Sequence, residues 1–178
     1  MLEILTRHMN EDKITILSTA PQMGRVCLEA GYGEMARIAV GHGGSARGKD
    51  VRLYTDYIGG CGTGRCYCAI QPNGLVTPCV FMPKVVGDLR KQGFMEIWDH
   101  CAEFQLLCDR EDRTDHCRIC HYRYQCGGCR ARAYNYTGDM RAGDPGCLYN
   151  LEQWERLARE EEEPISSLEE RVSADLAV

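Results

Sequence analysis

The clearest pattern of hydrophobic and polar positions lies between residues 94 and 108. Apolar side chains recur there every three or four positions, at Phe94, Ile97, Trp98, Cys101, Phe104 and Leu107 or Cys108. This spacing is typical of a helix that buries one face, and it predicts a single helix over 94–108. Cys101 and Cys108, like Cys27 on an earlier predicted helix, fall on apolar faces, so we expect them to be small buried side chains rather than ligands.

Weaker patterns flank this segment. Near the start of the chain they predict a short helix over residues 2–9, a strand over 14–17 and a second helix that begins at Pro21. At the far end a helix is expected from Asn150 until Pro164, with an acidic face exposed to solvent.

An Asn-Gly pair predicts a β-hairpin, because β-prone residues precede and follow Asn73 and Gly74. Both residues tolerate the positive φ that a two-residue turn needs. Such a turn would place Cys68 directly opposite Cys79, with Cβ atoms roughly 5 Å apart. Cys66, two residues earlier, would share that face of the strand. The pattern therefore predicts neighbouring thiols on one hairpin.

Composition narrows the class of protein. The chain has 178 residues with a net charge of -5, and it contains no basic stripe of the kind that binds nucleic acid. It has no apolar run near the ~20 residues that cross a bilayer, and charge falls where a signal peptide needs an apolar core. We therefore expect a cytoplasmic protein with neither nucleic-acid nor membrane partners. In a reducing cytosol, twelve cysteines point to metal or redox chemistry rather than disulfides.

Nine of the cysteines fall in two groups. One group holds Cys61, Cys66, Cys68 and Cys79, and the other holds Cys117, Cys120, Cys126, Cys129 and Cys147. Sets of four thiolates select zinc or iron–sulfur clusters. The two C-x-x-C pairs are separated by five residues, which is short beside the ~15–20 of a zinc ribbon. Nine thiols would suffice for two centres.

The order and spacing of these cysteines resemble a known family. Cys61 precedes Gly74-Leu-Val-Thr-Pro-Cys79, then the two C-x-x-C pairs follow and Cys147 comes last. Residues 59–150 thereby resemble the SPASM domain, the C-terminal auxiliary-cluster domain of radical S-adenosylmethionine (SAM) enzymes. The family commonly has three residues between the third and fourth cysteines of the central run, whereas two separate Cys126 from Cys129. This variant resembles a subset that includes enzymes of heme-type tetrapyrrole synthesis.

The resemblance implies two interleaved [4Fe–4S] clusters. One would be held by Cys117, Cys120, Cys126 and Cys147. The other would be held by Cys61, Cys79, Cys129 and one ligand from the 61–68 segment. The hairpin pairing favours Cys68 over Cys66 as that last ligand. With two clusters, two groups of four sulfurs should converge around two separate cavities. The alternative is a single cluster held by Cys117, Cys120, Cys126 and Cys129.

The resemblance also implies the architecture. We expect an α+β fold in which a small β-hairpin, helices and long irregular loops are organised around two cluster sites. Residues 1–58 would be the remnant of the end of a radical SAM barrel with a linker, 59–150 the iron–sulfur domain, and 151–178 an acidic helix and tail. No C-x-x-x-C-x-x-C motif is present, so no SAM site and no independent catalysis are expected. The chain resembles the C-terminal part of such an enzyme, from a truncated or split gene.

The expected role is electron transfer to or from a radical site, or substrate anchoring through an open iron. A separately encoded radical SAM barrel would be the partner, with a peptide or a tetrapyrrole as substrate of the full enzyme. Arginines near the second cysteine group would neutralise the anionic clusters and raise their reduction potentials, namely Arg118, Arg123, Arg130 and Arg132. The alternatives are a zinc-binding structural or interaction module and a nonfunctional gene fragment.

Overall fold

The computed structural model describes residues 17–18, 20–29, 37–40, 45–47, 59–152 and 155. The helix predicted over 2–9, most of the strand predicted over 14–17 and most of the predicted tail helix lie outside these residues, as does the side chain of Cys27. Contacts divide the chain into two compact units. One comprises Met1–Gly62 and Ile119–Cys129, and the other comprises Thr63–Arg118 and Arg130–Val178.

The first unit contains a three-stranded sheet. Strand β1 (Leu17–Ser18) pairs in parallel with β2 (Arg37–Val40), which pairs antiparallel with β3 (Ser45–Arg47). Helix α2 (Gln22–Glu29) follows β1 and precedes β2, as a parallel connection requires. The predicted helix at Pro21 is confirmed, because α2 begins at the next residue.

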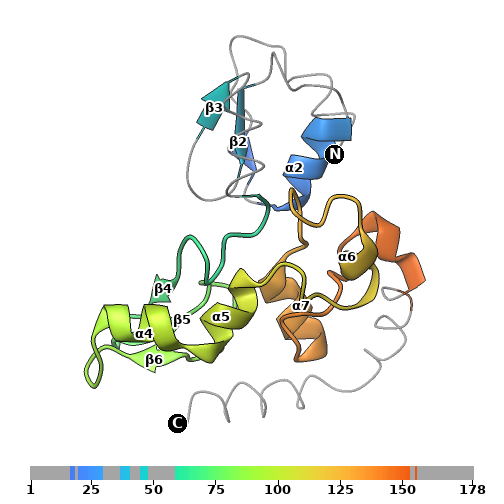
Figure 1. The fold of residues 1–178 in the computed structure, drawn as a ribbon. Coiled ribbons are helices and arrows are strands. Elements are labelled where there is room, and N and C mark those ends of the chain that lie inside the picture. The colour runs from blue at the N-terminus through green and yellow to red at the C-terminus, as the bar shows by residue number, and fades with distance from the viewer. Residues whose placement is uncertain are drawn as a thin grey trace. The chain divides into compact units, whose positions relative to one another are not determined.

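The second unit contains a small antiparallel sheet. Its strands are β4 (Ala69–Ile70), β5 (Leu75–Thr77) and β6 (Gly87–Asp88), paired in that order (Figure 1). The predicted hairpin is confirmed by the pairing of β4 with β5.

The predicted two-residue turn is wrong, however. Ala69 pairs with Thr77, and the N–H of Gln71 donates to the carbonyl of Leu75 at 2.8 Å, so the loop holds three residues and ends on Gly74 with φ of 82°. The reason is Pro72, which has no N–H with which to close the shorter turn. Continued by one pair, this register places Cys68 opposite Pro78 instead of Cys79.

The helix predicted over 94–108 is broken in two. Helix α4 (Phe94–His100) and helix α5 (Ala102–Cys108) meet at Cys101, which is extended with ψ of 123°. The N–H of Cys101 closes the first helix on Ile97, and its carbonyl accepts the N–H of Gln105 in the second. Cys101 is buried as predicted, but Cys108 is exposed, because Leu107 takes the buried position at the end of the second helix.

The core of the second unit lies between the sheet and these helices, which run over it in Figure 1. Val76 and Phe104 are almost fully buried there. A Cβ at Gly87 on β6 would lie 2.6 Å from the side chain of Ile97 on α4, so the absent side chain allows this close packing. Sheet and helices together confirm the α+β class.

Three further helices occupy the cysteine-rich segment. They are α6 (Asp115–Ile119), α7 (Arg130–Thr137) and the 3₁₀ helix η2 (Leu148–Asn150). The sequence predicts irregular loops here, so α7 is the main element that it misses. No helix in the described part of the chain is both long enough and apolar enough to span a bilayer.

Candidate metal centre

All eight predicted ligands have described side chains, and each is a free thiol. Cys79, Cys117 and Cys126 are buried, and the other five are half-buried. Free thiols in partly buried positions are the donors that iron–sulfur clusters require. The donor set therefore fits the expected cofactor in its chemistry.

Cys79 lies just after the hairpin in a well-bonded turn. Its sulfur accepts a hydrogen bond from the backbone N–H of Phe81 at 3.5 Å, and its carbonyl accepts one from Met82 at 3.0 Å. The hydroxyl of Thr77 also donates to that carbonyl at 3.1 Å. The backbone therefore fixes this thiol in place.

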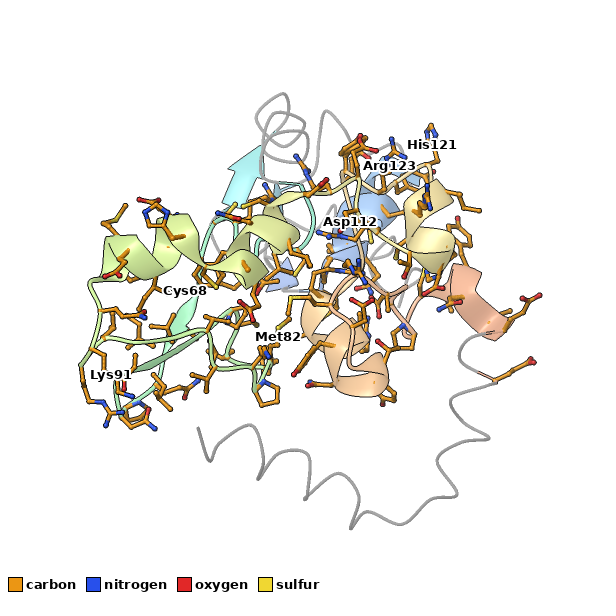
Figure 2. All side chains as sticks on the ribbon, turned by 60° about the horizontal axis from the view of Figure 1, so that its bottom comes forward. Cys68, Met82, Lys91, Asp112, His121 and Arg123 are labelled. Atoms are coloured by element: carbon orange, nitrogen blue, oxygen red, sulfur yellow. The ribbon has the colours of Figure 1, made fainter. Side chains whose placement is uncertain are left out.

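Figure 2 labels two residues of this region. Cys68 immediately precedes β4, and Met82 comes after β5. Cys68 is half-buried, and this burial raises the pKa of its thiol. Cys66, by contrast, is exposed. Because the observed register does not place Cys68 opposite Cys79, strand pairing no longer favours Cys68 over Cys66.

Cys61 and Cys126 come together in the first unit. The N–H of Cys61 donates to the carbonyl oxygen of Cys126 at 3.3 Å. Gly60 has φ of 62°, and a Cβ there would lie 1.9 Å from the same carbonyl oxygen. Only glycine allows this approach, so Gly60 lets the backbones at Cys61 and Cys126 lie side by side.

Cys120 repeats the arrangement of Cys79. Its sulfur accepts a hydrogen bond from the N–H of Tyr122, two residues later, at 3.4 Å. Gly127 and Gly128 both have positive φ, near 62° and 65°, which produces the tight turn between Cys126 and Cys129. Hydrogen bonds to sulfur stabilise a cluster's thiolate ligands and tune its potential.

Cys117 lies on α6 and is only 5% exposed. Nη2 of Arg130, at the start of α7, lies 3.7 Å from its sulfur, and Nε2 of His116 lies 3.6 Å from it. Arg130 is 1% exposed, so it is no surface charge. Arg118, by contrast, is exposed, and the guanidinium of Arg123 lies over the ring of Tyr124.

Cys147 is positioned by a turn that begins at Asp144. The carbonyl of Asp144 accepts the N–H of Cys147 at 3.0 Å, and its carboxylate accepts the N–H of Gly146 at 3.0 Å. Arg132 on α7 binds both carboxylate oxygens, at 2.6 and 2.9 Å. The side chain of Asp144 is fully buried.

The structure does not gather these thiols into formed metal sites. Among the residues that it describes, no three histidine, cysteine, aspartate or glutamate side chains form a group that could hold one metal ion. The expected convergence of two groups of four sulfurs and the assignment of ligands to clusters therefore stay predictions. Cluster ligation is commonly coupled to local folding, so ligands need not be preassembled before the cluster binds.

A family model decides the nature of this segment. Residues 61–129 match SPASM, described as an iron-sulfur cluster-binding domain. Residues 61–129 are a SPASM domain. The match contains seven of the eight predicted ligands, and Cys147 lies beyond it.

Curated relatives of this SPASM domain carry two kinds of name. An AdoMet-dependent heme synthase of Methanosarcina barkeri is 37% identical over 141 residues, which cover 78% of this chain and 38% of the relative. One of Nitratidesulfovibrio vulgaris is 41% identical over 90 residues, covering 51% and 24%. A PqqA peptide cyclase of Granulibacter bethesdensis is 32% identical over 91 residues, covering 48% and 24%. The chain thus spans well under half the length of these relatives.

From the sequence, Arg130 and Arg132 stand out only for their charge, and Asp115 and Asp144 are missed. Asp115 has φ of 52°, and its carboxylate accepts the N–H of Gly143 at 2.9 Å. Asp144 anchors the turn before Cys147, and Arg130 reaches Cys117 from α7. Asp144-Pro-Gly-Cys147 contains residues typical of a turn, but no local pattern reveals that Arg132 binds the Asp144 carboxylate from twelve residues away.

Proposed function

We propose that this chain binds two auxiliary [4Fe–4S] clusters. Cys117, Cys120, Cys126 and Cys147 would hold one, and Cys61, Cys79, Cys129 and Cys68 or Cys66 would hold the other. When bound, such clusters supply one-electron transfer, and a cluster with an open iron can also anchor a substrate. The SPASM match over residues 61–129 carries the proposal. We take 59–150 as the extent of the cluster-binding part.

The residues around the thiols support this role. Backbone N–H groups of Phe81 and Tyr122 donate to the sulfurs of Cys79 and Cys120. Such donors stabilise negative charge on thiolates, and they also hold each sulfur in a fixed direction. The chain's own contribution is thus to orient the ligands and to set the polarity around them.

The proposed partner is a radical SAM barrel, which would cleave SAM and exchange electrons with these clusters. The given sequence contains no C-x-x-x-C-x-x-C motif, and we propose that a separately encoded barrel supplies it. We propose a tetrapyrrole as the substrate of the assembled enzyme. The names of the heme synthase relatives and the Cys126-Gly-Gly-Cys129 spacing support it. A peptide substrate is the second candidate, supported by the PqqA peptide cyclase relative.

Anaerobic reconstitution of the full chain tests cluster binding. Wild type should bind about eight iron and eight sulfide per chain, as two [4Fe–4S] clusters require. Cys117→Ala should lose about half of both, since one four-iron cluster loses a ligand. The matched control is Cys101→Ala, which removes another buried thiol but should keep the full iron content.

Two results would contradict the proposal. A colourless protein that retains stoichiometric zinc and takes up no iron would indicate the zinc-binding module instead. Binding of only about four iron, unaffected by Cys147→Ala, would indicate the single-cluster alternative.

A further inference from the structure

Arg130 is a deeply buried charged side chain that contacts Cys117. It is 1% exposed, and its guanidinium donates to three groups. Nη1 donates to the carbonyl oxygens of Met140 at 3.0 Å and Ala142 at 2.7 Å, while Nη2 points at the sulfur of Cys117 at 3.7 Å. One planar fork therefore joins α7, α6 and the 140–142 segment.

The segment that Arg130 holds leads to Cys147. Two bonds tie this segment to the start of α6. The N–H of Thr114 donates to the carbonyl of Arg141 at 3.0 Å, and the N–H of Gly143 donates to Asp115. Cys117 and Cys147, thirty positions apart, are therefore held by one hydrogen-bonded frame with Arg130 at its centre.

The charge of Arg130 also acts on the nearby carboxylate of Asp139. Burial opposes ionisation of Asp139, but hydrogen bonds from Arg141 and the charges of Arg141 and Arg130 outweigh it and lower the pKa of Asp139. The hydrogen bonds of that carboxylate go to the side chain and backbone of Arg141. The Arg130 fork donates to two carbonyls and points at the Cys117 sulfur.

A buried cation beside a ligand sulfur has a defined electrostatic effect. A cluster held by four thiolates is anionic and gains a further negative charge on reduction. A charge-assisted donor at a ligand sulfur stabilises the reduced form more than the oxidised form, which raises the reduction potential. Because Arg130 lies out of water, this effect is weakly screened.

We propose that Arg130 is a positioning residue for the cluster of Cys117 and Cys147. It fixes the Cys117 sulfur and the segment that leads to Cys147, and it raises the potential of that cluster alone. This inference rests on the proposed function, because it takes both cysteines as ligands of one cluster.

The test is a redox titration of the reconstituted full chain, followed by electron paramagnetic resonance. The cluster of Cys117 is identified as the signal lost in Cys117→Ala. In Arg130→Gln that signal should shift to a more negative potential, with an about tenfold lower ratio of reduced to oxidised cluster at fixed potential, or ~59 mV for one electron. The second signal should stay in place. Arg130→Lys keeps the charge but loses the fork, so it should shift less.

Arg113 offers the matched control. It is also buried, and it donates to the carbonyls of Leu107 and Asp109 at 3.1 and 2.9 Å. Arg113→Gln should leave both potentials unchanged. The inference is overturned if Arg130→Gln keeps the wild-type potential, or if both signals shift equally. Should Arg130→Gln fail to retain clusters, Arg130→Lys decides: a negative shift supports the inference and an unchanged potential overturns it.

Failure of the proposed function would look different. Wild type would then bind no iron, or Cys117→Ala would lose none, before any arginine variant is compared.

Discussion

The backbone N–H of Cys61 donates to the carbonyl oxygen of Cys126 at 3.3 Å, joining residues 65 positions apart. The proposed ligand sets place these two cysteines on different clusters, so this bond would lie where the two sets interleave. It depends on Gly60, whose backbone passes too close to Cys126 for any side chain. The missing Cβ at Gly60 therefore allows Cys61 to lie beside Cys126.

Gly60→Ala should destabilise the chain and lower its cluster content. Alanine at φ of 62° costs ~1–2 kcal/mol, and the overlap with the Cys126 carbonyl adds to this cost because backbone must move. We expect a loss of at least about 2 kcal/mol. Thermal unfolding of reconstituted protein and its iron content are the measurements.

Gly138→Ala separates the cost of the positive φ from the cost of the overlap with Cys126. Gly138 also has positive φ, of 74°, but a Cβ there meets nothing within 4 Å. Its cost should be the conformational term alone, ~1–2 kcal/mol, with full iron content. Equal effects of the two variants would show that the contact with Cys126 does not matter.

Asp144→Asn should loosen the turn that carries Cys147. The buried carboxylate binds Arg132 through both oxygens, and losing one partner of a fully buried pair costs ~3–5 kcal/mol. Because the side chain of Arg132 is 36% exposed, solvent screens part of its interaction with Asp144. We therefore expect Asp144→Asn to lower the free energy of unfolding by about 2 kcal/mol. The apparent melting temperature should fall, together with the iron bound through Cys147.

Asp112→Asn is the control for that variant. Asp112 pairs with Arg141 at 3.8 Å, and both side chains are about half exposed. A surface pair of this kind contributes ~0–1 kcal/mol, so stability and iron content should barely change. A comparable loss in both variants would contradict a special role for Asp144.

The sequence predicts elements better than it predicts their registers and ends. The hairpin at Asn73 and Gly74 is present, but Pro72 cannot supply the N–H of a two-residue turn, so the loop gains a residue. The buried stripe over 94–108 is largely present as well, but the helix is interrupted at Cys101, and Leu107 rather than Cys108 is buried at its end. In the hairpin, a local hydrogen-bonding detail overrides a correct average pattern.

The cysteine order predicts the domain, whereas the contacts that hold the cysteines in place could not be predicted. Helix α7 buries Arg130 and two alanines, which gives no apolar stripe for a pattern to detect. The partners of Arg130 and Arg132 lie ten or more residues away and are defined only by the fold. The spacing of the cysteines is encoded locally, and the polar frame that orients them is encoded in tertiary contacts.

Cys66 and Cys68 can be distinguished as ligands by substitution. We expect Cys68→Ala to lose about half of the bound iron, because its half-buried thiol lies beside the hairpin that carries Cys79. Cys66→Ala should retain the full amount, because that thiol is exposed. Iron and sulfide analysis of both variants is decisive, and the reverse outcome would transfer the ligand role to Cys66.

With the clusters bound, alkylation rates should report how reactive the thiols are that are not proposed as ligands. Burial is the main cause that raises the pKa of Cys101, and its sulfur also lies 3.2 Å from a carboxylate oxygen of Glu103. Since the thiolate is the reactive form, a raised pKa means that Cys101 is mostly protonated at pH 8. Cys108 is exposed and serves as the internal comparison.

Iodoacetamide at pH 8 should therefore label Cys108 well before Cys101, as peptide mass spectrometry would show over a time course. The rate at Cys101 should keep rising as the pH passes 9, because its folded pKa lies above the ordinary value of 9.0. Glu103→Gln removes the nearby negative charge, so it should lower the pKa of Cys101 and speed its labelling without changing Cys108. Labelling of Cys101 as fast as Cys108 would show that the break between α4 and α5 opens readily to solvent.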